Sequence, residues 1–387
     1  MSKRWYLRKL FLSILIHLSV VFATVAQTDS CQLQISLLTC SPGEELYSSW
    51  GHTAIRVVDS SSGTDIVFNY GTFDDSDPLF LAKFTKGLMV YSLSAYPFSE
   101  FVEEYKYYKR GVIEQILQLD CPTKKNIFEA LRQNYSGDNR FYNYYFHSDN
   151  CTTRARDILA KNIGKSLRLG QVIPQEVPTL RNLIHQYLDS SKQYWSKLGI
   201  DILLGSTLDQ KVTNEQAMFL PDFLMKGFDS AKLDNKPLVL HSTTILSVPP
   251  TTQTSHFLTP TVILWLLALI IIWFGFSRKK AATKFLAVFD RLLFILLGLL
   301  GALLLILWII RIDTVCRNNF NLLWALPTHL LIGLIPWNKK WVKTYFKINT
   351  IIGIVLLLLF FLLPQQLNTA LIPLILLIAI RSRNLSK

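Results

Sequence analysis

One cysteine stands where the backbone makes a thiol reactive. Cys151 lies in YNYYFHSDNCTTRARD, where Asp149 and Asn150 are capping residues before a predicted helix over 152–161. The unpaired amides and the positive end of the helix dipole at such a start stabilise a thiolate and lower the pKa of the thiol. The same amides can hold an oxyanion when a carbonyl is attacked. Cys151 is our candidate nucleophile; the competing interpretation is a disulfide cysteine that happens to begin a helix.

A thiolate nucleophile needs an imidazole beside it as general base. His52 follows Trp50 and Gly51 at the beginning of the β-branched segment HTAIRVV, which is a rigid place to present a side chain. For His147, in a predicted loop before the cysteine, we expect a surface role. Three further histidines are expected to be solvated or packing residues: His185, His241 and His256. His52 is therefore the predicted base.

A third polar group orients the imidazole in many Cys-His sites. The segments 52–58 and 65–71 are predicted strands, and SSSG at 60–63 is typical of a hairpin loop. If the turn centres on Ser61 and Ser62, His52 lies across from residues 69–71. Either Asn69 or Tyr70 would then orient the ring. A register shift of one residue exchanges their faces, and we take Asn69 as the candidate.

The elements that must position these residues form an α+β pattern. Apolar alternation predicts strands at 35–40 and 111–119, beside the hairpin. Amphipathic periodicity predicts helices at 80–88, 99–110 and 122–134, with more helices after Thr179. The stretch that contains His241 and His256 is expected to be a polar tail.

The other cysteines and the tyrosines leave alternatives open. Cys31, Cys40 and Cys121 share the region with Cys151, but their pairing cannot be read from the sequence. The sequence has no C-x-x-C or Cys/His ligand spacing, so we expect neither a metal nor a cofactor. Six tyrosines could face lipid headgroups or serve as ordinary core residues: Tyr105, Tyr107, Tyr108, Tyr142, Tyr144 and Tyr145.

The ends of the chain are apolar and basic. The mean hydropathy is +0.28 and only 17% of residues are charged, because apolar residues concentrate beyond residue 258. Residues 1–26 combine a basic start, an apolar run and small residues, as in a signal peptide or an uncleaved anchor. Five apolar segments follow the exported region 27–258, within a membrane domain over 259–387: 259–276, 286–310, 320–337, 348–363 and 366–380.

Charge places the two sides of the membrane. Lys and Arg follow the first, third and fifth apolar segments, which the positive-inside rule requires if the region 27–258 lies outside. The last pair of segments could instead be a re-entrant hairpin. The net charge of +13 comes from the membrane part and the N-terminus, whereas the region between is mildly acidic. This distribution excludes nucleic-acid binding. Four residues at the outer end of the third segment are candidates for headgroup contact: Asn318, Asn319, Asn321 and Trp324.

Several blocks in order resemble a known family. GHTAIRV, FNYGTF, KFTKGLMVYSL, GVIEQILQL, DNCTTRARDIL and LGIDILLGS…AMFLPDFL are similar to the periplasmic domain of the Lnb family, the lipoprotein N-acyltransferases of Bacteroides-type bacteria. NNFNLLWALPTHLL extends the resemblance into the membrane part. The order of a histidine strand before a cysteine helix also resembles a circularly permuted papain-like fold, as in lecithin:retinol acyltransferase-like enzymes.

This resemblance implies a function. Cys151 and His52 would be catalytic in moving an acyl chain from a phospholipid, through a thioester, to the α-amine of a diacylglyceryl-cysteine on a lipoprotein. The enzyme would sit in the bacterial inner membrane, with its catalytic domain in the periplasm. Two other classes stay open: a membrane-anchored cell-wall cysteine hydrolase of the NlpC type, and a non-catalytic membrane scaffold in which Cys151 is disulfide-bonded.

Overall fold

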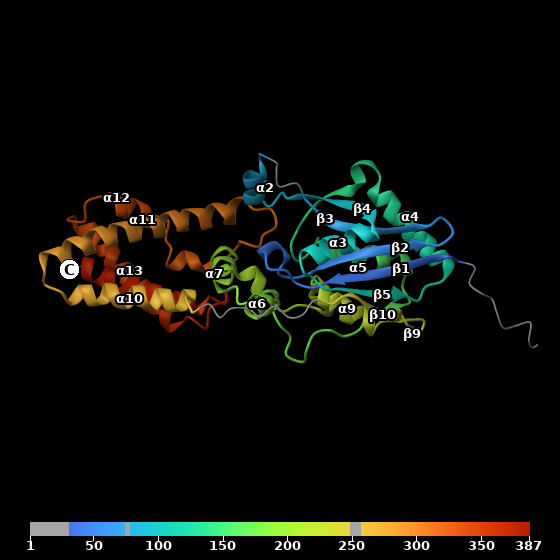
Figure 1. The fold of residues 1–387 in the computed structure, drawn as a ribbon. Helices are drawn as coiled ribbons and strands as arrows, with labels where there is room; N and C mark the ends of the chain where they lie inside the picture. The colour runs from blue at the N-terminus through green and yellow to red at the C-terminus, as the bar shows by residue number, and fades with distance from the viewer. Residues whose placement is uncertain (1–30, 74–77, 248–256) are drawn as a thin grey trace, which may run out of the picture.

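The molecule is elongated, with a sheet domain at one end and a bundle of apolar helices at the other (Figure 1). The computed structural model describes residues 31–73, 78–247 and 257–387. The predicted signal segment 1–26 and His256 lie outside these described residues. A group of short helices lies between the two ends.

A seven-stranded antiparallel sheet forms the exported part, in the order β10-β5-β1-β2-β3-β4-β6. The hairpin of β2 and β3 has the predicted register, since Ile55 pairs with Phe68 and Arg56 with Val67. The strands are β1 (Leu33–Cys40), β2 (His52–Asp59), β3 (Thr64–Thr72), β4 (Val90–Pro97), β5 (Val112–Leu117), β6 (Phe141–Asn143) and β10 (Val239–Leu246). A small second sheet contains β7 (Leu167–Arg168), β8 (Lys232–Leu233) and β9 (Lys236–Pro237).

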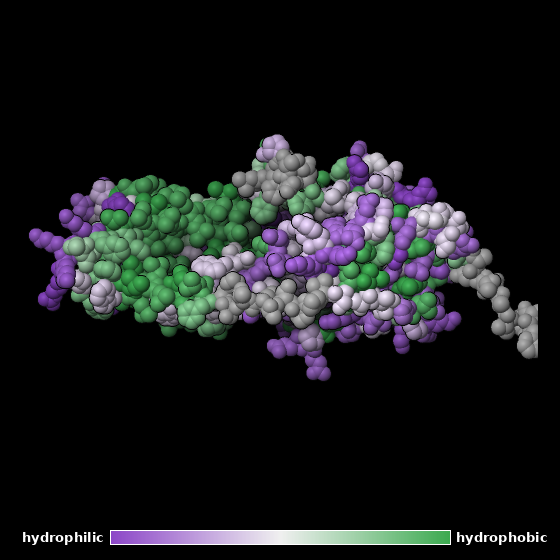
Figure 2. Space-filling view, viewed as in Figure 1, coloured by the Kyte–Doolittle hydropathy of each residue, from purple (hydrophilic) through white to green (hydrophobic). Residues whose placement is uncertain are grey.

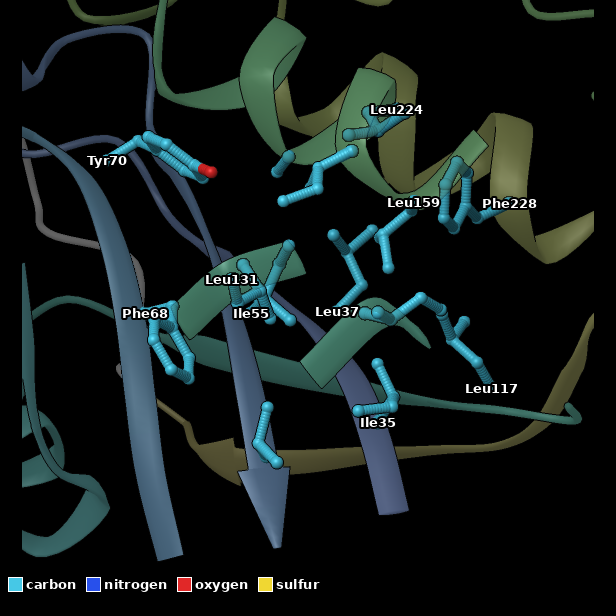
Figure 3. Close-up of a cluster of buried hydrophobic side chains, with 14 of the residues drawn as sticks. Ile35, Leu37, Ile55, Phe68, Tyr70, Leu117, Leu131, Leu159, Leu224 and Phe228 are labelled. Carbon is cyan, nitrogen blue, oxygen red and sulfur yellow. The ribbon is translucent and has the colours of Figure 1, made fainter. Parts of the chain in front are cut away.

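Both faces of the large sheet are covered, which explains why β1 is buried at all but one of its positions. Ile35 and Leu37 point into the main core, which α4 and α5 close from one side (Figure 3). Leu38 and Cys40 alternate to the opposite face and pack with Phe101 of α3. The helices of this part are α2 (Phe80–Lys86), α3 (Phe98–Tyr107), α4 (Cys121–Tyr135), α5 (Cys151–Ile163), α6 (Leu180–Ser190), α7 (Tyr194–Leu203), α8 (Asn214–Ala217) and α9 (Pro221–Asp229).

Two features of this domain were not predicted from the sequence. A disulfide joins Cys31, just before β1, to Cys121 at the start of α4, with 5.5 Å between their Cα atoms. Residues 239–246, expected as a polar tail, form the edge strand β10 beside β5. Most β10 side chains are exposed, so the strand has the polar composition of a tail although its backbone is paired.

The apolar helices form the other end of the molecule. Two of them are long and apolar enough to cross a membrane by length and composition, namely α11 and α13, and two shorter apolar helical stretches cover 260–276 and 320–334. The helices are α10 (Pro260–Phe276), α11 (Lys280–Ile310), α12 (Thr328–Leu334), α13 (Lys340–Leu358) and α14 (Ile372–Leu385). Their exposed side chains make a hydrophobic band that ends at a hydrophilic tip (Figure 2).

The segment predicted as one span over 320–337 is broken. A short 3₁₀ turn over Phe320–Leu323 precedes α12, and the chain between them contains Pro327. This segment packs on α11 at Gly298 and Gly301, where any side chain would collide with the backbone of Leu330 and Ala325. Close packing on two glycines therefore replaces the regular helix that the apolar composition indicated.

A buried ionic cluster ties α6 and α7 to the membrane part. The Arg181 guanidinium donates to Asp201 at 2.8 Å and to Asp209 at 2.9 Å. Asp201 is fully buried, and it also accepts from His185 at 2.7 Å and from Asn368 at 2.9 Å. Burial opposes the charge of Asp201, but these partners lower the pKa of its carboxyl, so that the group is ionised.

Three of the four residues proposed for headgroup contact belong to this junction instead. The amide groups of Asn319 and Asn321 donate to the backbone carbonyls of Ile202 and Asp201 at 2.8 and 2.9 Å. The Trp324 indole donates to Asn321 at 2.9 Å. All three side chains are buried, so the headgroup prediction was wrong for them, while Asn318 is exposed.

Replacing Arg181 by Met should destabilise the protein by about 3–5 kcal/mol, because Asp201 stays buried and loses its main cation. The midpoint of thermal unfolding of the detergent-solubilised protein measures the effect. Lys197→Met is the matched control, since its ion pair with Asp189 is partly exposed to solvent, at 21% and 48% of the two side chains, and contributes about 0–1 kcal/mol. Equal midpoints for the two variants would contradict this account of the junction.

Candidate active site

Cys151 is the first residue of α5, and the preceding asparagine fixes it there. The Asn150 side-chain oxygen accepts from the amides of Thr152 and Thr153 at 2.9 and 2.8 Å. Its NH₂ group donates to the carbonyls of Phe146 and Phe219. The cap therefore holds both the helix start and the loop before it, which is the arrangement that the SDNCTT sequence predicted.

His52 meets Cys151 at the end of the sheet. Gly71 of β3 lies beside both, since a Cβ added to it would be 3.5 Å from Cys151 Cβ and 3.6 Å from His52 Cε1. The His52 imidazole and the Cys151 sulfur interact through charge and hydrogen bonding, and the Thr53 amide donates to the sulfur. Gly71 has a φ of +102°, so a side chain here would be strained as well as crowded.

The Asn69 side chain binds the His52 imidazole at the ring nitrogen that faces away from Cys151. His52 Nε2–H donates to Asn69 Oδ1 at 2.5 Å, which leaves Nδ1 toward the sulfur. Asn69 Nδ2 donates to the Tyr96 hydroxyl at 3.1 Å, and that hydroxyl donates to Glu104 at 3.2 Å. The orientation of the base is therefore set by a chain of hydrogen bonds that ends at a carboxylate on α3.

The pair shifts the pKa values of its members in opposite directions. Burial alone would raise the pKa of Cys151, but the charge and hydrogen bond of His52, with the Thr53 amide and Thr152 hydroxyl, lower it to about 7. Burial alone would lower the pKa of His52, but the charge of Cys151 and hydrogen bonds to Cys151 and Asn69 raise it. Near neutral pH this arrangement favours a thiolate beside an imidazolium.

A second thiol near His52 behaves differently. Cys40 pairs with His52 across β1 and β2, but its side chain is completely buried and burial raises its pKa to about 12. Cys40 is thus an uncharged packing residue at neutral pH. Cys151 is a free thiol in the structure, which argues against its interpretation as a disulfide cysteine.

Three tyrosines belong to, or pack against, the core cluster that contains Cys151. Tyr91 and Tyr144 stack with ring centroids 4.2 Å apart, and Tyr142 pairs with Tyr91 across β4 and β6. Burial and the charge of Cys151 raise the pKa of all three hydroxyls, so they are neutral hydrogen-bond donors at pH 7. Tyr105 is a core residue, whereas Tyr107 and Tyr108 are largely exposed.

The other residues considered from the sequence lie elsewhere. Tyr70 points into the core on the opposite face from Asn69, and its hydroxyl accepts from Asn134 at 3.2 Å. His147 is half-buried near Asp313, and burial lowers its pKa. His185 belongs to the ionic cluster, and His241 is exposed on β10.

Sequence reasoning missed Tyr96, Glu104 and Gly71. The roles of Tyr96 and Glu104 depend on the pairing of β3 with β4, in which Asn69 lies opposite Ser94, two residues from Tyr96. When the sequence predicts a catalytic-site Asn on a strand, the residue that forms a hydrogen bond with its side chain can be sought on the neighbouring strand.

The end of the sheet at which β2 begins lies toward the apolar helices (Figure 1). The Arg311 guanidinium, just after α11, donates to the Phe84 carbonyl of α2 at 2.7 Å, and the Ile312 amide donates to Lys86 at 3.1 Å. Trp50, next to the site, donates to the Ile184 carbonyl of α6 at 3.4 Å. Contacts at α2 and at Trp50 therefore connect this domain to elements that lead into the apolar helices.

Comparison with known families matches both parts of the chain. Residues 23–186 match the description "Lnb N-terminal periplasmic domain", and residues 252–386 match "Lnb transmembrane domain". No curated protein and no solved structure matches the chain.

Alkylation of Cys151 by iodoacetamide should follow a titration with a midpoint near pH 7, against an ordinary thiol value of 9.0. About half of the thiol is then ionised at neutral pH, compared with roughly one part in a hundred for an unperturbed thiol. His52→Ala removes the main cause of the lowered pKa, so the midpoint should move above 9.

Mass spectrometry of the labelled peptide measures this titration, and Cys151→Ser gives the background from Cys40 and Cys316. A wild-type midpoint near 9, or one that His52→Ala leaves in place, would contradict the ion pair.

Proposed function

The chain belongs to the Lnb family, and from this premise we propose that it transfers a fatty acyl chain from a phospholipid to the α-amine of a diacylglyceryl-cysteine on a lipoprotein. The observation that carries the proposal is the Cys151–His52–Asn69 arrangement at the membrane-facing end of an exported domain. In this proposal Cys151 is the nucleophile, His52 the general base and acid, and Asn69 the residue that positions the imidazole.

We further propose that the exported domain has a circularly permuted papain-like fold. Its helix-start cysteine packs beside a strand-start histidine, and the histidine comes first in the chain. An asparagine accepts from the imidazole nitrogen that faces away from the sulfur. These are the roles that define a Cys-His-Asn site, which is recognised by geometry and not by sequence order. The division into 1–26, 27–258 and 259–387 remains our prediction.

In the first step the Cys151 thiolate attacks the carbonyl carbon of a phospholipid ester. The new C–S bond forms as the carbonyl π pair moves to oxygen. The oxyanion then collapses, the C–O bond to glycerol breaks, and the His52 imidazolium protonates the departing oxygen. The products are a lysophospholipid and an acyl thioester on Cys151.

In the second step the neutral α-amine of the lipoprotein attacks the thioester carbonyl. His52, now uncharged, takes the proton of the amine as the tetrahedral intermediate forms and collapses. The C–S bond breaks and the thiolate returns beside the imidazolium. The amide product and the restored ion pair complete the cycle without any cofactor.

The membrane part gives this chemistry its substrates. Both acyl donor and acceptor are held in a bilayer by their chains, at about 0.8 kcal/mol for each buried methylene, so an enzyme free in water would have to extract them. A membrane protein with an exported domain can bring its thiolate to them instead. We assign the protein to the inner membrane, with the catalytic domain in the periplasm.

A groove lined by charged residues beside the Cys151 sulfur would favour the alternative function, which is hydrolysis of the cell wall. A polar cavity of about 710 Å³ does lie between α4 and α5, where Arg154, Asp157 and Lys161 line it. Neither Cys151 nor His52 is among its lining residues, so it does not supply such a groove. Hydrolysis is therefore an outcome for the assay to test and not a second proposal.

Exposure of the detergent-solubilised protein to phospholipid without acceptor should leave an acyl adduct on Cys151, because no amine is present to resolve the thioester. Intact mass spectrometry detects the added acyl mass, and neutral hydroxylamine should remove it. Absence of the adduct together with release of peptide fragments from peptidoglycan would favour the hydrolase.

Addition of a diacylglyceryl lipopeptide should convert the adduct to an N-acyl product. Cys151→Ser should abolish product, and His52→Ala should lower the rate by roughly 10²- to 10⁴-fold through loss of acid–base catalysis. His241→Ala, on the exposed edge strand, is the matched control and should keep the wild-type rate. An active His52→Ala variant would remove the imidazole from the mechanism.

A further inference from the structure

One buried hydroxyl at the site has no partner in the protein. The Tyr142 side chain is 6% exposed, and its hydroxyl makes no hydrogen bond with any described residue. Only four buried side-chain atoms in the described ranges are in this state; the others are Thr39 Oγ1, Arg110 Nη2 and Gln115 Oε1. An unsatisfied buried hydroxyl destabilises the folded protein, so a position that keeps one calls for an explanation.

The ring of Tyr142 is held firmly on several sides. The Arg154 guanidinium lies 3.7 Å above its centroid, and Asp149 fixes that guanidinium with contacts of 2.6 and 2.9 Å. Tyr70 meets the ring edge-to-face at 6.1 Å. Strand pairing with Tyr91 sets the backbone position. The hydroxyl is therefore presented at a fixed place and cannot turn away to find a partner.

That place lies against α5, the helix that begins with the nucleophile. Tyr142 and Cys151 belong to the same buried cluster, and Arg154 is one helical turn after Cys151 on α5. The charge on Cys151 also acts on the Tyr142 hydroxyl more strongly than any neighbouring charge does. Tyr142 thus offers a neutral O–H donor within the cluster that contains the sulfur.

We propose that the Tyr142 hydroxyl donates a hydrogen bond to the oxyanion that forms when Cys151 attacks an acyl carbonyl. This inference rests on the proposed thioester chemistry and adds a catalytic residue to it. The Asn150 side-chain oxygen already accepts from the amides of Thr152 and Thr153. Of the first three amides of α5, the amide of Cys151 is therefore left as a second donor to the oxyanion.

The electron and proton balance of both steps allows this role. The carbonyl oxygen gains the π pair as the C–S or C–N bond forms, and it accepts the Tyr142 hydrogen bond without taking the proton. The pair returns to carbon when the intermediate collapses, and Tyr142 is unchanged. A donor that has no partner in the free enzyme loses no hydrogen bond when the oxyanion appears, which is how preorganised stabilisation works.

Tyr142→Phe tests the role, because it removes one oxygen atom and keeps the ring with its Arg154 and Tyr70 contacts. We expect acyl transfer from phospholipid to the lipopeptide acceptor to fall by roughly 10²- to 10³-fold, the usual effect of losing one oxyanion donor. The alkylation midpoint of Cys151 should stay near pH 7. The midpoint of thermal unfolding should be unchanged or higher, since an unsatisfied polar atom is removed.

Tyr70→Phe is the matched control. Tyr70 is a neighbour in the same core, but its hydroxyl already accepts from Asn134. This variant should therefore lose thermal stability and keep the wild-type rate, which is the reverse of the pattern expected for Tyr142→Phe.

An activated ester, p-nitrophenyl acetate, separates this proposal from the proposed function. Its burst of p-nitrophenol reports acylation of Cys151 whether or not lipids are substrates. A Tyr142→Phe burst rate equal to wild type would overturn the oxyanion role. So would a lower rate accompanied by a shifted thiol titration or a lower unfolding midpoint. A wild-type burst without any N-acyl lipopeptide product would instead overturn the proposed function.

Discussion

The need to ionise the thiol of Cys151, a residue that is only 8% exposed, is the constraint around which the exported domain is organised. Burial of an anion is costly unless opposite charge and donors surround it. Here they come from two distant parts of the chain: His52 and the Thr53 amide on β2, and the Thr152 hydroxyl on α5. The helix start must therefore be fixed against the strand start to within hydrogen-bond reach. The Asn150 cap and the packing of α5 on the sheet serve this end.

The central residues of the site were predictable because their signals are local. Capping residues next to Cys151, a β-branched run after His52 and a short loop at 60–63 each fix a position within a few residues. Asn69 followed from the hairpin register, and the structure places it on the imidazole. Tyr96 and Glu104 were not predictable, since they reach the site through the pairing of β3 with β4 and the placement of α3. Such non-local pairing leaves no mark on a short stretch of sequence.

The same distinction applies to the rest of the fold. β10 was mistaken for a tail because an edge strand with exposed side chains has a tail's composition. The broken third apolar segment and the buried asparagines at its outer end depend on contacts with α11 and α7. Hydropathy predicted the membrane part, which the family match supports. It could not distinguish a straight helix from a helix that is interrupted by packing. Polar residues that are predicted to lie at a membrane surface can instead form the hydrogen bonds that join two domains.

The bridge joins Cys31 to Cys121, which lie 90 positions apart in the chain, and the loop that it closes contains His52 and Asn69 but not Cys151. Closing so long a loop restricts the unfolded chain by about 4–5 kcal/mol in the chain-entropy description. It also means that a protease cutting once between the two cysteines cannot release either fragment. On the exported side of the membrane proteases are met and thiols oxidise readily. There the segment that carries His52 stays joined to the segment that carries Cys151 even after a single cut in the backbone between the two bridged cysteines.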